Sequence, residues 1–301
     1  MSVPSEVVAR APGKVNLALV VGPLRRDGYH ELVNVFHAVS LTDDVAARPA
    51  DDVTVTVDGA HAERVPCDGS NLAVRAARLL AERAGVTDGV QLHITKHIPV
   101  AGGMAGGSAD AAAALLACDT LWQTGMSRED LHGLAAELGS DVPFALVGGT
   151  AVGTGRGEEL TSALARGEYE WVVAVSDAGL STPAVYAELD RLREGRPVAV
   201  PRVPDGLMEA LRSGDADALG ESLHNDLQPA ACSLVPALER TLEIGREYGA
   251  LGALVSGSGP SVAFLVRDHE QALDISVALT ASGAADDVRR ARGPVTGARL
   301  L

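Results

Sequence analysis

Four glycines stand within a run of six residues, from Gly102 to Gly107, directly before the strongly helix-forming run Ala109 to Leu116. Glycine lets backbone N–H groups turn toward one point, and the first turn of a helix adds unpaired donors and a partial positive charge. A glycine loop that opens into a helix is therefore typical of an anion site. The simpler alternative is a flexible turn, although two glycines would suffice for that.

Composition limits what the anion can be. The chain has 301 residues, of which 47% are hydrophobic, enough for one large or two medium-sized domains. Its net charge of −15 disfavours nucleic acid and membrane surfaces as partners, so local positive groups must attract any phosphate. No apolar run is long enough to span a membrane, and the N-terminus has no signal-peptide pattern. Three widely spaced cysteines favour a reducing, cytoplasmic setting over disulfides or a zinc site.

The chain has only two lysines, Lys14 and Lys96. Lys96 lies three residues before Pro99, at the mouth of the glycine loop, and Lys14 lies in a turn that leads into an apolar strand. A lysine is a compact charge on a flexible stem, which arginine does not replace where one ammonium must reach one oxygen. Both lysines are therefore candidates for phosphate contacts, with chance survival at surface positions as the alternative.

Hydrophobic periodicity predicts an α+β protein. We expect two domains, residues 1–165 and 166–301, with a joint near residues 160–168 and a ligand cleft between them. Strands are predicted at 7–10, 15–21, 53–57, 90–95, 150–154, 171–175, 253–256 and 262–266. Helices are predicted from a cap at Ser70 to Glu82, at 108–122, from a cap at Ser127 to Leu138, and at 183–193, 205–212, 216–223, 235–248 and 269–281.

The two commonest nucleotide-binding loops do not fit. A Walker loop needs Gly-x-x-x-x-Gly-Lys-Ser/Thr; Gly102 and Gly107 have this spacing, but Ser108 and Ala109 occupy the last two places. A dinucleotide loop needs Gly-x-Gly-x-x-Gly, which no frame across the glycine loop satisfies. A Rossmann oxidoreductase is therefore disfavoured.

The run Pro-x-x-x-Gly-x-x-Gly-Gly-Ser-Ala from Pro99 resembles the phosphate loop of the GHMP kinases, a family of small-molecule kinases. Ala-Pro-Gly-Lys-Val-Asn at 11–16 and Val-Ser-Gly-Ser-Gly-Pro at 255–260 resemble two further motifs of the family, in the same order. The resemblance implies a two-domain α+β fold with a left-handed β-α-β crossover and an active-site cleft between the domains. It also implies ATP as the phosphoryl donor, with Mg²⁺.

Four further segments resemble the branch of the family whose acceptor is a cytidyl diphosphate sugar alcohol; they are residues 26–32, 71–78, 139–143 and 225–229. This resemblance covers essentially the whole chain. It implies transfer of the ATP γ-phosphoryl group to the 2-hydroxyl of that acceptor, in the non-mevalonate route to isoprenoid precursors. A homoserine- or mevalonate-type kinase and a non-catalytic binding protein on the same fold are the alternatives. The presence of both Lys14 and Asp141 disfavours the non-catalytic binding protein.

The resemblance also implies which residues act on ATP. Lys14 and Asp141 match the family's catalytic pair, in which the lysine stabilises charge and the aspartate orients the acceptor hydroxyl. Taken alone, Asp141 is an ordinary turn aspartate. The ATP-contacting set is Pro99, Val100, Ala101, Gly102, Gly103, Met104, Ala105, Gly106, Gly107 and Ser108, with Lys96 and Asn71 toward the base or ribose.

For the acceptor, the resemblance implies that Tyr29 and His30 contact the cytosine, and aromatic residues are only 3% of the chain. The other acceptor positions are Asn16, Thr182, Tyr186, Gly257, Ser258 and Gly259. Thr182 also fits a helix cap, and residues 256–259 also fit a plain hairpin turn. Asp110, expected in the first turn of a helix, complements its dipole, so no metal ligand is assigned. We expect a monomer or weak homodimer.

Overall fold

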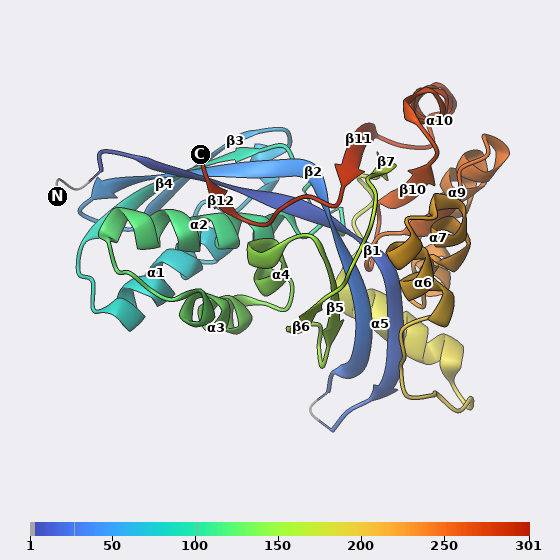
Figure 1. Cartoon of the computed structure of the whole chain (residues 1–301), viewed down its shortest axis with the longest axis horizontal. Helices are drawn as coiled ribbons and strands as arrows, with labels where there is room; N and C mark the ends of the chain where they lie inside the picture. Colours follow the sequence, from blue (N-terminus) through green and yellow to red (C-terminus); the bar gives the residue numbers. More distant parts are fainter. Residues whose placement is uncertain (1–3, 27, 101) are drawn as a thin grey trace.

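Two sheets organise the chain (Figure 1). The computed structural model describes residues 4–26, 28–100 and 102–301. Within them, one eight-stranded sheet contains β1 (Val7–Leu24), β2 (His30–Ala50), β3 (Thr54–Gly59), β4 (Gly89–Lys96), β5 (Thr150–Thr154), β6 (Glu159–Ser162), β8 (His224–Asn225) and β12 (Arg299–Leu300). A four-stranded sheet contains β7 (Tyr169–Val175), β9 (Gly252–Val255), β10 (Val262–Val266) and β11 (Asp287–Gly293).

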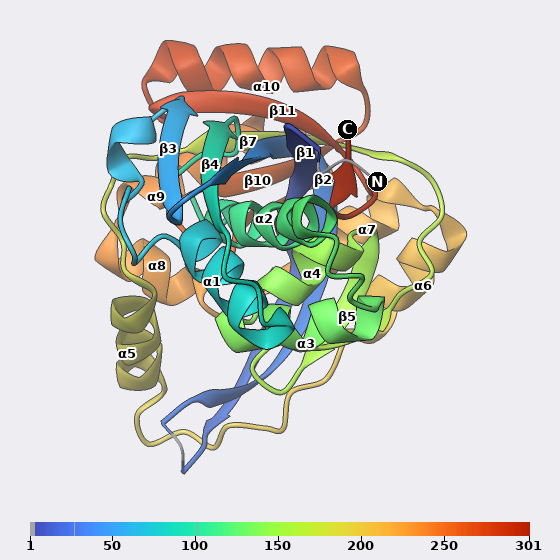
Figure 2. The same cartoon turned by 90° about the vertical axis from the view of Figure 1, so that its left-hand side faces the viewer.

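Three helices pack against the first sheet, α1 (Leu72–Ala84), α2 (Gly106–Trp122) and α4 (Val142–Val147), and α3 (Arg128–Leu138) packs on these helices (Figure 2). A short 3₁₀ helix, Ala62–Arg64, follows β3. Helix α2 is apolar on nearly every side, and its alanine run from Ala111 to Ala114 is completely buried. A helix that is apolar all round must lie inside a core. This burial fixes the position of the helix that the glycine loop opens into.

The helices of the second half pack around the four-stranded sheet. They are α5 (Thr182–Arg193), α6 (Asp205–Ser213), α7 (Ala216–Ser222), α8 (Gln228–Leu234), α9 (Ala237–Glu247) and α10 (His269–Ser282). Helices α6 and α7 contribute to the first apolar core, which contains α2, and the other four contribute to a second apolar core. Strands β7 and β10 form the middle of the four-stranded sheet, and Trp171 and Phe264 on them are fully buried. Phe264 packs into the second core, whereas Trp171 packs into the first core, so the four-stranded sheet contributes to both.

The two halves are joined through β1. Strand β8 pairs in parallel with β1, and the C-terminal strand β12 pairs with β1 in antiparallel. Late segments of the chain therefore complete the first sheet, while the division at residues 165 and 166 stays a prediction. Strands β3 and β4 are parallel and connect through α1, which is the kind of β-α-β unit expected from the family.

The sequence prediction missed seven strands and α-helices and misplaced some helix ends; the missed elements are β2, β6, β8, β11, β12, α4 and α8. The predicted cap at Ser70 is wrong, because Asn71 caps α1 by accepting a hydrogen bond from the N–H of Ala73, while Ser70 bonds Asp68. The helix predicted from residue 108 begins at Gly106. Asp110 therefore lies in the second turn, so the expected first-turn interaction with the helix dipole is also wrong.

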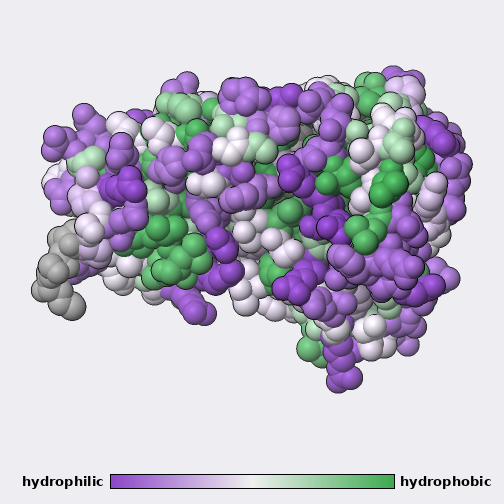
Figure 3. All heavy atoms as spheres, turned by 90° about the horizontal axis from the view of Figure 1, so that it is seen from above, coloured by the Kyte–Doolittle hydropathy of each residue, from purple (hydrophilic) through white to green (hydrophobic). Residues whose placement is uncertain are grey.

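Hydrophilic residues predominate on the face drawn in Figure 3, with small apolar patches between them. Across the residues that the structure describes, no helix combines the length and apolar character needed to cross a membrane.

Candidate active site

The glycine loop is attached to Lys14 by two hydrogen bonds. The Lys14 backbone N–H donates to the Met104 carbonyl over 3.1 Å, and the ammonium donates to the Gly103 carbonyl over 2.7 Å. Lys14 is only 5% exposed, and burial lowers its pKa, although the charge of Asp141 opposes that shift. Lys14 and the glycine loop, 89 positions apart in the sequence, are therefore held together as one unit.

The turn predicted at Lys14 is wrong, because Lys14 lies inside β1. Lys14 and Asn16 lie two residues apart on this strand, so their side chains project from the same face. The Lys14 ammonium donates to Asn16 Oδ1 over 2.7 Å, and Asn16 Nδ2 donates to Asn34 Oδ1 over 2.7 Å. On the other side, Lys14 Nζ lies 4.0 Å from Asp141 Oδ2. Asp141 is the residue before α4. The structure therefore brings together the predicted catalytic pair and the predicted polyol contact.

The shape of the loop requires glycine at Gly103. Its φ is +69°, and a Cβ there would lie 2.2 Å from the Ser256 carbonyl oxygen. Ala105, also with positive φ, precedes α2, and no side chain caps the helix there. The N–H groups of the first turn, from Gly106 to Ser108, are therefore left for an anion. Pro99 and Val100 lead into the loop, and Ala101 lies outside the described residues.

The turn between β9 and β10 closes this site from the second half. Ser256 Oγ donates to the Gly103 carbonyl over 3.2 Å, and a Cβ on Gly257 would lie 3.3 Å from Lys14 Nζ. Asn225 Nδ2 donates to the Gly257 carbonyl over 2.7 Å and holds the turn. The segment is a hairpin turn and also lies against the predicted catalytic lysine. The sequence prediction gave no bracing role to Ser256 or Asn225.

Beside this turn lies a pair of stacked rings. The His30 and Tyr186 ring centroids are 5.2 Å apart with 27° between the planes. Burial raises the pKa of Tyr186 to about 12, and the charge of Asp141 adds to that shift. The charge of Asp141 therefore acts on the Tyr186 phenol. Tyr29 is 55% exposed, with the Arg156 guanidinium 5.3 Å from its ring centroid.

Thr182 is the first residue of α5, and the predicted cap at this position is wrong. Ser181 is the N-cap, because its Oγ accepts a hydrogen bond from the Ala184 N–H. The Thr182 hydroxyl instead lies 2.8 Å from Ser258 Oγ. Two predicted acceptor positions, one on α5 and one in the β9–β10 turn with Gly259, are thereby brought together.

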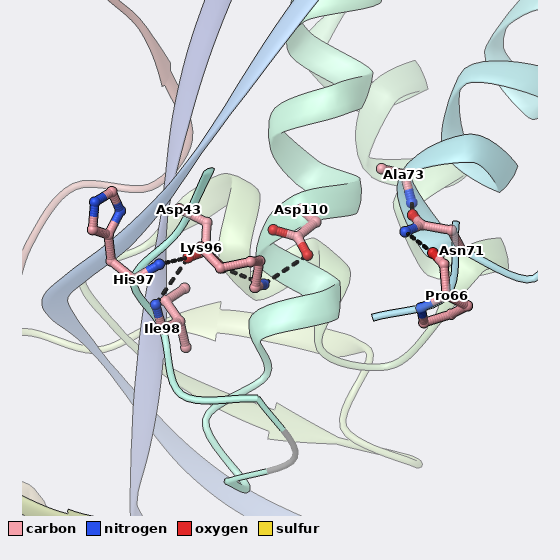
Figure 4. A network of polar contacts seen from close by, with 8 residues as sticks. All are labelled: Asp43, Pro66, Asn71, Ala73, Lys96, His97, Ile98 and Asp110. Carbon is pink, nitrogen blue, oxygen red and sulfur yellow. Dashed lines mark hydrogen bonds and ion pairs between the residues drawn. The ribbon is translucent and has the colours of Figure 1, made fainter. Parts of the chain in front are cut away.

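Lys96 lies in a buried ionic cluster with two carboxylates (Figure 4). Its Nζ is 2.5 Å from Asp43 Oδ2 and 2.7 Å from Asp110 Oδ2, and the backbone N–H groups of His97 and Ile98 donate to Asp43 Oδ1. Burial alone lowers the pKa of Lys96, but the two carboxylates outweigh it and raise the pKa above its usual value. The sequence prediction did not anticipate Asp43.

Asn71 uses its amide within the protein. Its Oδ1 accepts from the Ala73 N–H and its Nδ2 donates to the Pro66 carbonyl over 2.8 Å, as drawn in Figure 4. The Oδ1 atom thus caps α1 and the Nδ2 atom holds the segment before it, so both ends of the amide have partners within the protein. The nucleotide contacts expected of Asn71 and Lys96 stay predictions.

Carboxylates, histidines and cysteines do not gather in groups of three fit for a metal ion within residues 4–26, 28–100 and 102–301. Two surface cavities, of about 480 and 540 Å³, are lined by none of the predicted site residues. The site is defined instead by the convergence of the glycine loop, the start of β1, the β9–β10 turn and α5.

Comparisons with known proteins agree with this arrangement. Residues 71–149 match the family model of the GHMP kinases N terminal domain, and residues 207–285 match that of the GHMP kinases C terminal. A 4-diphosphocytidyl-2-C-methyl-D-erythritol kinase of Streptomyces avermitilis is 58% identical, covering 98% of this chain and 99% of the relative. One from Leifsonia xyli is 55% identical, covering 98% of each.

Solved structures extend the comparison. The crystal structure of a 4-(cytidine 5'-diphospho)-2C-methyl-D-erythritol kinase superposes with a TM-score of 0.76 at 34% identity, covering 95% of this chain and 98% of that one. The crystal structure of L. major mevalonate kinase in complex with R-mevalonate also superposes with a TM-score of 0.76, covering 99% of each chain. Its sequence identity is only 19%, so this similarity shows the fold alone. With similarity of sequence over nearly its whole length, the chain belongs to the GHMP kinase family, among the 4-diphosphocytidyl-2-C-methyl-D-erythritol kinases.

Proposed function

We propose that this chain transfers the γ-phosphoryl group of ATP to the 2-hydroxyl of 4-diphosphocytidyl-2-C-methyl-D-erythritol and releases ADP, in the non-mevalonate route to isoprenoid precursors. The observation that carries this proposal is the position of the Lys14 ammonium. It bonds the Gly103 carbonyl of the phosphate loop and lies 4.0 Å from Asp141 Oδ2. One cation thus lies between the donor loop and the carboxylate that would receive the acceptor hydroxyl.

Phosphoryl transfer depends on positioning and on charge stabilisation more than on covalent chemistry by the protein. The N-terminus of α2 attracts the ATP phosphates, and Lys14 stabilises negative charge on the transferring group. The 2-hydroxyl oxygen bonds the γ-phosphorus as the bond from that phosphorus to the bridging oxygen of ADP breaks. Asp141 orients the hydroxyl and takes its proton.

Mg²⁺ is the divalent ion that such a reaction uses, and it would neutralise phosphate charge when bound with ATP. The residues near the loop do not offer it a ready protein site, because Asp110 and Asp43 already share the Lys96 ammonium. Mg²⁺ commonly keeps several waters and binds through substrate phosphates. We therefore assign it no ligand among the described residues.

A substrate panel tests the proposed function. ATP consumption is measured with 4-diphosphocytidyl-2-C-methyl-D-erythritol, homoserine, galactose and mevalonate at equal concentrations. We expect turnover with the first compound and only background with the others. Faster turnover with any of the other three would overturn the assignment. ATP binding without turnover of any acceptor would favour a non-catalytic binding protein.

The stacked Tyr186 provides a test of the acceptor side. Tyr186→Ala removes a ring that lies 5.2 Å from His30, and stacking on a base is worth about 1–3 kcal/mol. We expect the KM for the acceptor to rise about 10-fold or more while the KM for ATP stays within about twofold. Tyr186→Phe keeps the ring and should restore most of the affinity. Tyr248→Ala, at a half-exposed tyrosine after α9, is the control.

We also infer a cytoplasmic location, which the free thiols of Cys67, Cys118 and Cys232 support, because cytosolic thiols are kept reduced. The monomer or weak homodimer expected from the sequence stays a prediction, which the solution mass of the purified chain would test.

A further inference from the structure

His30 is held on two sides. Its ring stacks on Tyr186, and its Nε2 lies 2.9 Å from Asp190 Oδ1 on α5, 160 positions away in the sequence. The His30 side chain is only 6% exposed, so its ring is nearly enclosed. Across residues 4–26, 28–100 and 102–301, Nδ1 has no hydrogen-bond partner, and it is not among the fully buried unpartnered atoms. One ring nitrogen is therefore engaged and the other is available to a ligand.

The hydrogen-bond partner of His30 Nε2 determines whether Nδ1 donates or accepts a hydrogen bond. An ionised carboxylate only accepts hydrogen bonds, so Asp190 requires a hydrogen on Nε2. In a neutral imidazole with its hydrogen on Nε2, Nδ1 is an acceptor. In the metal sites of other proteins, a carboxylate commonly orients a histidine in this way, by bonding the ring nitrogen that does not bind the metal. Asp190 therefore presents His30 to the ligand as an acceptor.

Cytosine and uracil differ at the atom that such an acceptor would meet. Cytosine has an exocyclic amine that donates, whereas the corresponding position of a uracil-type base is a carbonyl oxygen that accepts. An acceptor facing another acceptor in an enclosed site leaves both without a partner, which a binding site rejects strongly. We infer that Asp190 is a positioning residue that fixes the His30 tautomer and thereby selects a cytosine over a uracil base; this rests on the proposed function.

Neighbouring carboxylates do not offer the same contact. Glu188, two residues earlier on α5, is bonded to Arg191 and to Ser233. Asp226 is bonded to His224 and Arg193. Asp190 has His30 as its hydrogen-bond partner and is otherwise 48% exposed, so its removal opens no cavity in the core. Variants at this position should therefore fold.

The test compares the cytidyl substrate with its uridyl analogue, identical except in the base. We measure kcat and KM for both in the unmodified chain, Asp190→Ala and Asp190→Asn. In Asp190→Ala we expect the ratio of kcat/KM for the two substrates to fall about 10-fold, through KM for the cytidyl substrate with kcat nearly unchanged. Asp190→Asn retains an acceptor oxygen and should keep most of the preference. Glu188→Ala is the matched control on the same helix and should leave the ratio unchanged.

A spectroscopic measurement separates tautomer control from a merely structural role. Nitrogen-15 spectra of the histidine-labelled chain should show His30 with its hydrogen on Nε2, and Asp190→Ala should shift His30 toward a mixture of tautomers. An unchanged substrate ratio or an unchanged tautomer in Asp190→Ala would overturn the inference. If the unmodified chain turns over neither substrate, the proposed function fails instead, so the two failures are distinguishable.

Discussion

Lys14→Met and Asp141→Asn should each lower kcat by about 10³-fold while the affinity for ATP stays nearly unchanged. Lys14 Nζ lies 2.7 Å from the Gly103 carbonyl and 4.0 Å from Asp141, at the junction of the donor loop and the acceptor hydroxyl. Negative charge that develops on the transferring phosphoryl group would lie near the Lys14 ammonium. This ammonium is nearly buried, and electrostatic stabilisation is stronger in a buried site than in water. In the proposed mechanism, backbone N–H groups of the loop hold the ATP phosphates, and neither substitution removes them.

Single-turnover kinetics and ATP titration measure the two quantities separately. Asp217→Asn, at an exposed carboxylate on α7, is the control for Asp141→Asn and should leave kcat unchanged. Lys14→Met also loses the hydrogen bonds to Asn16 and Gly103, which can lower the stability of the fold. Thermal unfolding of each variant is therefore measured together with the kinetics. Near-normal turnover by a folded variant would remove that residue from the mechanism.

Some local features of the site could be predicted from the sequence because each depends on neighbouring residues. The two-residue spacing of Lys14 and Asn16 can be read from the sequence, but their common strand face could not, because the predicted strand begins at residue 15 and β1 begins at Val7. The glycine loop and the start of α2 follow from glycine content and helix propensity over a short stretch. Their joining through the Gly103 carbonyl depends on tertiary packing and could be inferred only from a resemblance.

Strand β2 shows why other parts could not be predicted. It is 21 residues long and carries buried polar residues, including Asn34, His37 and Asp43, at positions where a strand signal needs apolar ones. Asn34 bonds Asn16 and Asp43 bonds Lys96, so these polar residues satisfy one another across the fold. Their partners lie 18 and 53 positions away, respectively. Periodicity within a window cannot detect such pairing.

The rarity of lysine drew attention to Lys96, but it could not distinguish a contact with the ligand from a contact beneath the loop. In the structure the ammonium lies against the phosphate loop from inside, because a Cβ on Gly106 would lie 3.2 Å from Nζ. Asp43 on β2 and Asp110 on α2 therefore meet through Lys96 below the first residue of the helix. We interpret this cluster as a brace for the phosphate loop.

Lys96→Met should destabilise the fold by about 3–5 kcal/mol, because removing one partner leaves buried carboxylates uncompensated. Chemical denaturation measures the loss, and the KM for ATP in the folded fraction should rise as the loop loses its support. Adding Asp110→Asn to Lys96→Met removes one of the two unpaired carboxylates and should recover part of the stability. A double variant no more stable than Lys96→Met alone would contradict the brace.

The loss of stability in Lys96→Met should also depend on pH. Burial raises the pKa of Asp110 from 3.8 to about 7, with Asp43 adding to the shift and Lys96 opposing it. A raised pKa means that the folded chain holds a proton that the unfolded chain has released, so this stabilising contribution is lost as pH rises from about 4 to about 7. Without Lys96 the Asp110 carboxyl holds its proton more tightly, so the pH range over which stability falls extends upward. The cost of Lys96→Met should therefore be larger at about pH 8.5 than at about pH 5.5. An equal cost at both pH values would mean that Lys96 acts through packing of its side chain rather than through its charge.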